Sequence, residues 1–239
     1  MNSSFVILVG LAELAGLAGM GLTITWMIKY LGGFGWDGFA KQFNVHPLMM
    51  TVGMIFINGN ALMLYRVTLS LNLPRIIVKF CHLGLQLLAA GCGSIGLAAV
   101  FGYHKNIGAS DLYSFHSWVG LTTFIMFGIQ LLFGFLFFIL FFFLLPRSEN
   151  LRGRFLPIHV FFGKMILILA TITTCMGIQE KAMFAMADKY KDIPVQALIA
   201  HAAGISFTIF TFIVMYIMSN DSYKAQSRRD GYHLQANST

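Results

Sequence analysis

Six long runs of apolar residues, separated by short polar segments, dominate the pattern of the chain. A helix needs about 20 apolar residues to cross the hydrocarbon core of a bilayer. The pattern therefore predicts an all-α membrane protein with six transmembrane helices. The expected spans are Phe5–Ile28, Pro47–Tyr65, Val78–Phe101, Ser117–Leu145, Pro157–Ile178 and Val195–Met218. Residues 1–219 then form the transmembrane domain, and residues 220–239 form a polar cytoplasmic tail.

The composition agrees with a membrane protein. Hydrophobic residues make up 57% of the 239 residues and charged residues only 10%, whereas soluble domains carry about 25% charged residues. This excludes a soluble globular domain, a disordered chain and a disulfide-rich scaffold. The formal net charge is +7, but the basic residues form no dense cluster with interleaved aromatics, so we expect no nucleic-acid partner.

The distribution of charge predicts the orientation of the spans. With six spans, both termini share one side with two loops and the tail. That side carries nine basic residues and three acids, and the opposite side carries six basic residues and five acids. Loops on the cytoplasmic side are enriched in Lys and Arg. We therefore expect both termini in the cytoplasm.

Four histidines lie near the starts of predicted spans. His46 and His116 begin spans that start on the outer side, and His82 and His159 begin spans that start on the cytoplasmic side. The four therefore form two layers, each shared by two helices. Intramembrane ionisable residues are costly and usually functional, although a single histidine can also simply bond a backbone carbonyl.

Two imidazoles that face each other across a helix bundle are typical axial ligands of a haem iron. A di-iron site needs Glu-x-x-His motifs, and the spans hold one carboxylate, Glu13. A zinc site needs three or four ligands at one depth. Two stacked haems would carry electrons across the membrane. A haem-free small-molecule transporter and a quinol-linked bis-histidine oxidoreductase stay open as alternatives.

Five segments resemble the cytochrome b561 family of ascorbate-dependent transmembrane reductases. They are FNVHPLMM (43–50), GNALMLYRV (59–67), KFCHLGLQ (79–86), DLYSFHSWVG (111–120) and LPIHVFFG (156–163). The resemblance implies a four-helix haem-binding core in spans two to five and two haem b cofactors. Their iron ligands would be His46 with His116 and His82 with His159. It also implies a homodimer and cytosolic ascorbate as the electron donor.

The same resemblance implies one substrate site at each face. Arg66, Arg75, Lys79 and Arg152 match the basic inner ascorbate site, and a basic mouth suits the ascorbate anion. His104, expected in an outer loop, and Tyr113, three residues before His116, match the outer site. The chain would then reduce monodehydroascorbate or a ferric chelate at the outer face. Its membrane would be that of a secretory vesicle, an endolysosome or the cell surface.

Two further charges, Glu13 and Lys164, lie at similar depths in spans one and five. Their opposite signs lead to the hypothesis that they form a buried ion pair between the two helices. His201, early in span six, has no role that the sequence assigns.

Overall fold

A computed structural model describes residues 3–68, 73–140 and 149–223. Six helices in these segments are long and apolar enough to cross a membrane, as the sequence predicts. The first is α1 (Ser3–Tyr30). The second is a single rod made of α2 (Ala40–Met50), the π-helix η1 (Thr51–Ile57) and α3 (Asn58–Val67). The others are α4 (Arg75–Ile107), α5 (Phe115–Phe135) continued by η3 (Leu136–Leu140), α7 (Glu149–Met186) and α8 (Val195–Ser219).

The helices extend beyond most of the predicted spans. The second helix begins at Ala40, seven residues before the expected Pro47, and α4 runs on to Ile107. The apolar pattern misses such ends because their first and last turns are polar. The last part of the expected fourth span, residues 141–145, lies outside the described residues, as does nearly all of the predicted tail, residues 224–239.

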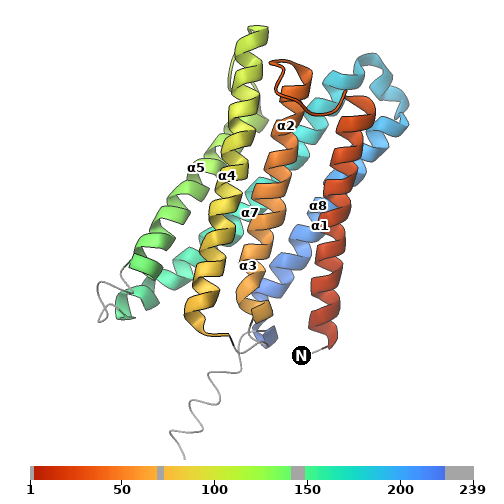
Figure 1. Cartoon of the computed structure of the whole chain (residues 1–239). Helices are drawn as coiled ribbons and strands as arrows, with labels where there is room; N and C mark the ends of the chain where they lie inside the picture. The colour runs from red at the N-terminus through yellow and green to blue at the C-terminus, as the bar shows by residue number, and fades with distance from the viewer. Residues whose placement is uncertain (1–2, 69–72, 141–148, 224–239) are drawn as a thin grey trace, which may run out of the picture.

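The helices pack in pairs along the bundle (Figure 1). The α2 segment lies against α4, α5 lies against α7, and α1 lies against α8. The beginning of α1 and the short turn η5 (Asp221–Tyr223) meet at one end, where the rings of Phe5 and Tyr223 lie 5.1 Å apart. We call this end the terminal face and the opposite end the distal face.

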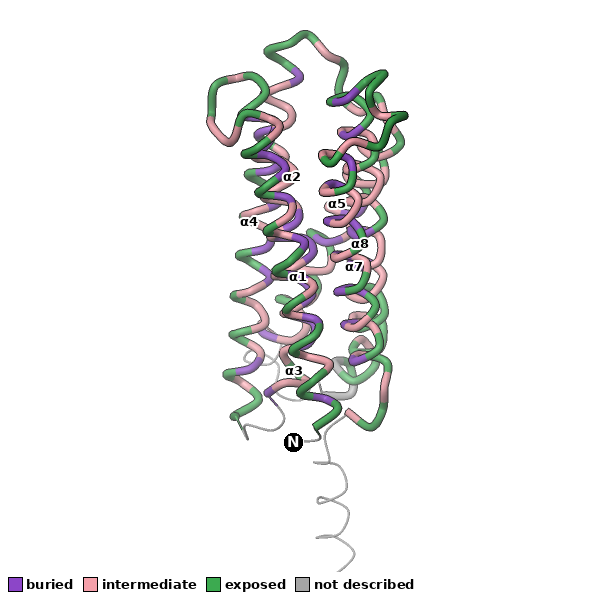
Figure 2. The backbone as a smooth tube through the Cα atoms, turned by 90° about the vertical axis from the view of Figure 1, so that its right-hand side faces the viewer, coloured by how far each residue is buried: buried purple, intermediate pink, exposed green. Residues whose placement is uncertain are grey.

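Small residues allow the α1–α8 pair to approach closely. An added Cβ at Gly19 would come 2.8 Å from the Phe207 ring of α8, and one at Gly16 would come 3.2 Å from the Phe210 ring of α8. Buried positions point toward the bundle interior, and exposed positions lie on its outside (Figure 2). Phe207 and Phe210 are fully buried, whereas Phe212 is 69% exposed. Since large apolar side chains cover this outer surface, it suits lipid rather than water.

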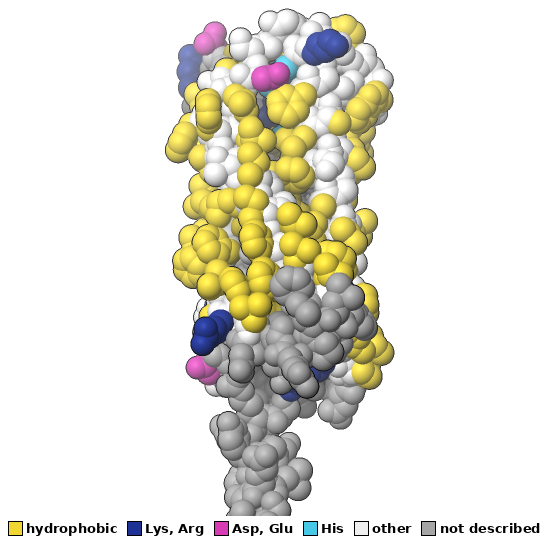
Figure 3. Space-filling view, turned by 90° about the vertical axis from the view of Figure 1, so that its left-hand side faces the viewer, with side chains coloured by type: hydrophobic (Ala, Val, Ile, Leu, Met, Phe, Trp, Pro, Cys, Tyr) yellow, Lys and Arg dark blue, Asp and Glu magenta, His cyan; other side chains and the backbone are white. Residues whose placement is uncertain are grey.

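The surface has the layered chemistry of a membrane protein. On the face that Figure 3 shows, hydrophobic side chains cover the middle, and Lys, Arg, Asp and Glu side chains lie near the two ends. The four histidines lie within the membrane-spanning helices. His46 on α2 and His116 on α5 belong to the distal half, and His82 on α4 and His159 on α7 belong to the terminal half.

Candidate metal centres

The histidine rings face each other in the two pairs that the sequence predicts. The ring centres of His46 and His116 lie 6.2 Å apart. Those of His82 and His159 lie 6.3 Å apart. Each pair joins two helices that do not pack directly on each other, because α2 packs on α4 and α5 on α7. The pairs therefore bridge the two halves of the four-helix core.

Backbone carbonyls fix the chemical state of the rings. A carbonyl oxygen only accepts, so the ring nitrogen beside it carries the proton, and the other ring nitrogen is left bare for a metal. Three rings donate from Nδ1 in this way: His46 to Gly96 at 3.0 Å, His82 to Ala61 at 2.9 Å and His116 to Thr173 at 2.9 Å. In these three histidines, Nε2 is therefore the free ligand atom.

Two glycines give the rings of the α5–α7 half their space. A Cβ added at Gly177 would lie 2.6 Å from Cε1 of His116, and one at Gly134 would lie 3.0 Å from Cε1 of His159. The His159 ring also packs against Phe138, with ring centres 5.1 Å apart. Glycine at these positions lets the helix backbone approach the imidazole edge, so packing holds both rings, and a hydrogen bond also holds that of His116.

This arrangement fits an iron atom between each pair of rings. Two imidazoles that held one iron between them through Nε2, each with a metal–nitrogen bond of about 2 Å, would have ring centres about 6 Å apart. The ring-centre separations of 6.2 and 6.3 Å agree with that value. In residues 3–68, 73–140 and 149–223, no three His, Cys, Asp or Glu side chains gather to hold a metal ion. Bis-histidine ligation of haem therefore fits better than a zinc or di-iron site.

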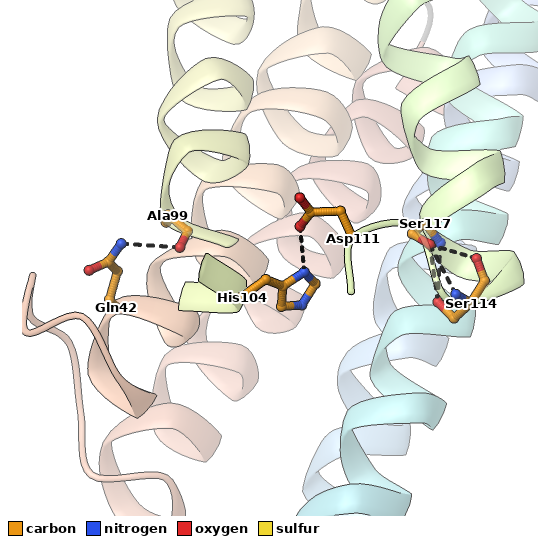
Figure 4. Close-up of polar contacts among 6 residues, drawn as sticks. All are labelled: Gln42, Ala99, His104, Asp111, Ser114 and Ser117. Carbon is orange, nitrogen blue, oxygen red and sulfur yellow. Dashed lines mark hydrogen bonds and ion pairs between the residues drawn. The ribbon is translucent and has the colours of Figure 1, made fainter. Parts of the chain in front are cut away.

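At the distal face, His104 forms a side-chain hydrogen bond that the sequence did not predict. His104 lies in the last turn of α4, not in a loop as expected, and it is 8% exposed. Its Nδ1 lies 3.0 Å from the Asp111 carboxylate (Figure 4). Nearby, Gln42 donates to the Ala99 carbonyl at 3.3 Å and so ties the start of α2 to α4. The contact with Asp111 leaves Nε2 as the His104 atom that can exchange a proton.

Tyr113 lies beside His104, in the segment that joins α4 to α5. The helix α5 begins only at Phe115, capped by the Ser114 side chain, so Tyr113 does not share a helix face with His116. Its ring centre lies 5.8 Å from that of His104. Burial, together with the hydrogen bond and charge of Glu180, raises the pKa of Tyr113 to about 12. The hydroxyl therefore keeps its proton at neutral pH.

At the terminal face, the predicted basic residues have different surroundings. Lys79 donates from Nζ to the Phe138 carbonyl at 3.4 Å, close to the ring that packs on His159. Arg66 donates to the Met218 carbonyl at 3.0 Å, which ties α3 to the end of α8. Arg75 is the first residue of α4. The side chain of Arg152 lies outside the described residues.

Comparison with known proteins identifies the family. Residues 45–185 match the family model described as eukaryotic cytochrome b561. The chain is 39% identical over 217 residues to the transmembrane ascorbate-dependent reductase of Sus scrofa, covering 90% of this chain and 83% of that protein.

This chain belongs to the cytochrome b561 family. It is also 39% identical over 206 residues to the lysosomal membrane ascorbate-dependent ferrireductase of Mus musculus, covering 84% of this chain and 83% of that protein. The plasma membrane ascorbate-dependent reductase of Xenopus tropicalis is 34% identical over 223 residues, covering 92% of this chain and 77% of that protein. The family name confirms the predicted resemblance and implies haem b as the cofactor class.

The predicted ion pair between Glu13 and Lys164 is wrong. Lys164 donates from Nζ to the Ser219 hydroxyl at 3.1 Å. The Glu13 carboxylate lies instead beside the Asn60 amide, in a cavity of about 350 Å³. The two side chains therefore point toward different helices, Glu13 toward α3 and Lys164 toward the end of α8.

The sequence did not predict several groups that position the histidine rings. The accepting carbonyls belong to Gly96, Ala61 and Thr173, whose residue types carry no ligand chemistry. Gly177 and Gly134 are two of 24 glycines in the chain and carry no separate signal. His201, unassigned from the sequence, shares a hydrogen bond of 3.0 Å with the Tyr190 hydroxyl and so links α8 to the distal turn after α7.

Proposed function

We propose that this chain is a transmembrane ascorbate reductase that takes electrons from cytosolic ascorbate and delivers them to an acceptor at the opposite face. Two haem b groups would be its cofactors. When bound, a haem iron supplies one-electron chemistry by changing between its ferric and ferrous states. The names of the related proteins, ascorbate-dependent reductases and a ferrireductase, support this proposal.

The observation that carries the proposal is the facing of two histidine pairs at two depths. His82 and His159 would hold the haem nearer the terminal face, and His46 and His116 the haem nearer the distal face. The ring separations of 6.2 and 6.3 Å would let the two histidines of each pair hold one haem iron between them. The carbonyls that accept from Nδ1 raise the basicity of the ligand nitrogen and prevent the ring from rotating.

The terminal face would bind ascorbate. On the proposed orientation this face is cytosolic, in keeping with its excess of Lys and Arg. Ascorbate is a monoanion at neutral pH, and a basic mouth raises its local concentration. Lys79 donates to the Phe138 carbonyl, and the Phe138 ring packs on His159 of the terminal pair. Arg66, Arg75 and Arg152 would extend the positive potential around it.

The distal face would deliver the electron to monodehydroascorbate or a ferric chelate. Reduction of monodehydroascorbate to the ascorbate anion takes up one electron and one proton. His104, with Nδ1 held by Asp111, can supply that proton from Nε2. Tyr113 stays protonated beside it and can donate a hydrogen bond to an acceptor oxygen. The protein would act as a homodimer in the membrane of a secretory vesicle, an endolysosome or the cell surface.

The decisive experiment is a redox titration of the purified protein, expressed with haem supplied. We expect two low-spin haem components that ascorbate reduces. His46→Ala and His116→Ala should remove one component, and His82→Ala and His159→Ala should remove the other. A colourless wild-type protein would overturn the proposal. Solute uptake by haem-free vesicles would favour a transporter, and reduction by quinol but not by ascorbate would favour a quinol-linked oxidoreductase.

A further inference from the structure

Lys181 is a cation whose position the proposed function does not explain. It lies near the distal end of α7 and is partly buried, whereas Lys189 and Lys191 in the next turn are exposed. Its Nζ lies 4.0 Å from the centre of the Phe43 ring on α2. In the part of the chain that the structure describes, no carboxylate lies within ion-pair distance of it.

The position of Lys181 relates it directly to the distal histidine pair. It follows Gly177, the residue against which the His116 ring packs, by four residues. Residues four apart share a helix face and differ by about 6 Å along the axis. Phe43 precedes His46 by three residues, and their ring centres lie 6.3 Å apart. Lys181 and Phe43 therefore meet one turn outward of the two ligands, between α7 and α2.

The surroundings of the ammonium group leave it short of negative charge. An aromatic face attracts a cation, but Phe is a weaker partner than Trp, and the gain is modest compared with that from a carboxylate. Charged groups in membrane proteins usually pair with one another or mark a pathway. The nearest acid in sequence, Glu180, is already used by the Ser114 hydroxyl at 3.0 Å and by Tyr113.

We propose that Lys181 binds an oxygen anion of the carboxylate type at the outer edge of the His46–His116 site. This inference rests on the proposed function, and it names a recognition group that the predicted outer residues do not include. Two sources carry that chemistry: a propionate of the haem itself, and the anionic electron acceptor. The Phe43 ring on α2 contacts the Lys181 ammonium group on α7, one turn outward of His46, where either anion would bind it.

The test compares Lys181→Met with Lys181→Arg, which keeps the charge, and with Lys189→Met, which removes an exposed charge from the same face. The readouts are the midpoint potential of each haem, the retention of haem on dilution, and the KM for ferric citrate. If the anion is a propionate, Lys181→Met lowers the potential of the distal haem. A tenfold change in the electron-transfer equilibrium is about 59 mV for one electron.

If the anion is the acceptor, Lys181→Met leaves both potentials unchanged and raises the KM for ferric citrate, with a weaker dependence on salt. Lys181→Arg restores the wild-type values in either case, and Lys189→Met matches wild type. Unchanged potentials, haem retention and KM in Lys181→Met would overturn the inference. A wild-type protein that binds no haem, or that ascorbate does not reduce, would overturn the proposed function. The variants of Lys181 test only the further inference, so the two failures can be told apart.

Discussion

Gly177→Ala is the most direct test of how the distal histidine pair is held. The substitution adds one methyl group on α7, beside the ring of His116. Two contacts with α7 constrain that ring: the hydrogen bond from Nδ1 to the Thr173 carbonyl, and the close approach of the Gly177 backbone. A methyl group at Gly177 conflicts with the second constraint and strains the first.

The structure gives the size of the conflict. The new Cβ would lie 2.6 Å from Cε1 of His116 and 3.0 Å from Nδ1, whereas ordinary contact begins at 3.4 Å. The ring edge must therefore move by about 0.8 Å, although metal–ligand bonds keep their lengths to within about 0.2 Å. Overpacking of this kind costs about 1–3 kcal/mol. The expected result is loss or weakening of the His46–His116 haem with the His82–His159 haem retained.

The assay is a redox titration of purified protein with haem spectra recorded at each potential. Gly134→Ala should have a smaller effect on the other component, because its Cβ would lie 3.0 Å from Cε1 of His159. Gly128→Ala is the matched control, since nothing lies within 4 Å of its Cβ position. The reasoning is refuted if Gly177→Ala keeps both components at wild-type potentials, or if Gly128→Ala disturbs them equally.

Three further predictions follow from particular contacts. The Tyr113 phenolate should form only near pH 12, because burial and the Glu180 carboxylate oppose its charge. The stability that the protonated hydroxyl contributes is therefore lost as the pH rises from about 10 to 12. An ultraviolet difference titration against Tyr113→Phe measures the ionisation of Tyr113, and ionisation near pH 10 would contradict the prediction. Glu13→Gln and Lys164→Met should be additive in a double-mutant cycle to within about 0.5 kcal/mol, since the side chains do not pair, and a larger coupling would show that they do. Lys79→Ala should raise the KM for ascorbate by roughly tenfold at low salt, with Lys79→Arg near wild type; equal KM values in both variants would remove Lys79 from the donor site.

Hydrophobic patterning was sufficient for the fold and for which histidines face each other. Six runs gave six helices, and chain direction alone placed His46 with His116 and His82 with His159 at matching depths. Patterning failed at helix ends. The polar last turn of α4 contains His104, so a residue expected in a loop is a buried helical side chain paired with Asp111.

Depth along a helix can be counted from the sequence, whereas rotation about its axis depends on packing. This difference explains the error at Glu13, whose helix packs on α8 and whose carboxylate turns toward Asn60 rather than toward α7. It also explains why the carbonyl acceptors were not predicted. Every residue has a carbonyl, and only the packed backbone decides which one meets an imidazole nitrogen.

The π-helix η1 shows how much depends on that rotation. It lies between α2 and α3 in one span, so the turns that carry His46 and Ala61 are separated by a segment with i→i+5 hydrogen bonds. The wider turns offset α3 from the register that a continuous α-helix would have. With this offset, one rod presents His46 to α5 and the Ala61 carbonyl to His82 on α4. The second span thus supplies His46 to the distal pair and, through the Ala61 carbonyl, orients His82 of the terminal pair. This single helix therefore couples the geometry of the two sites.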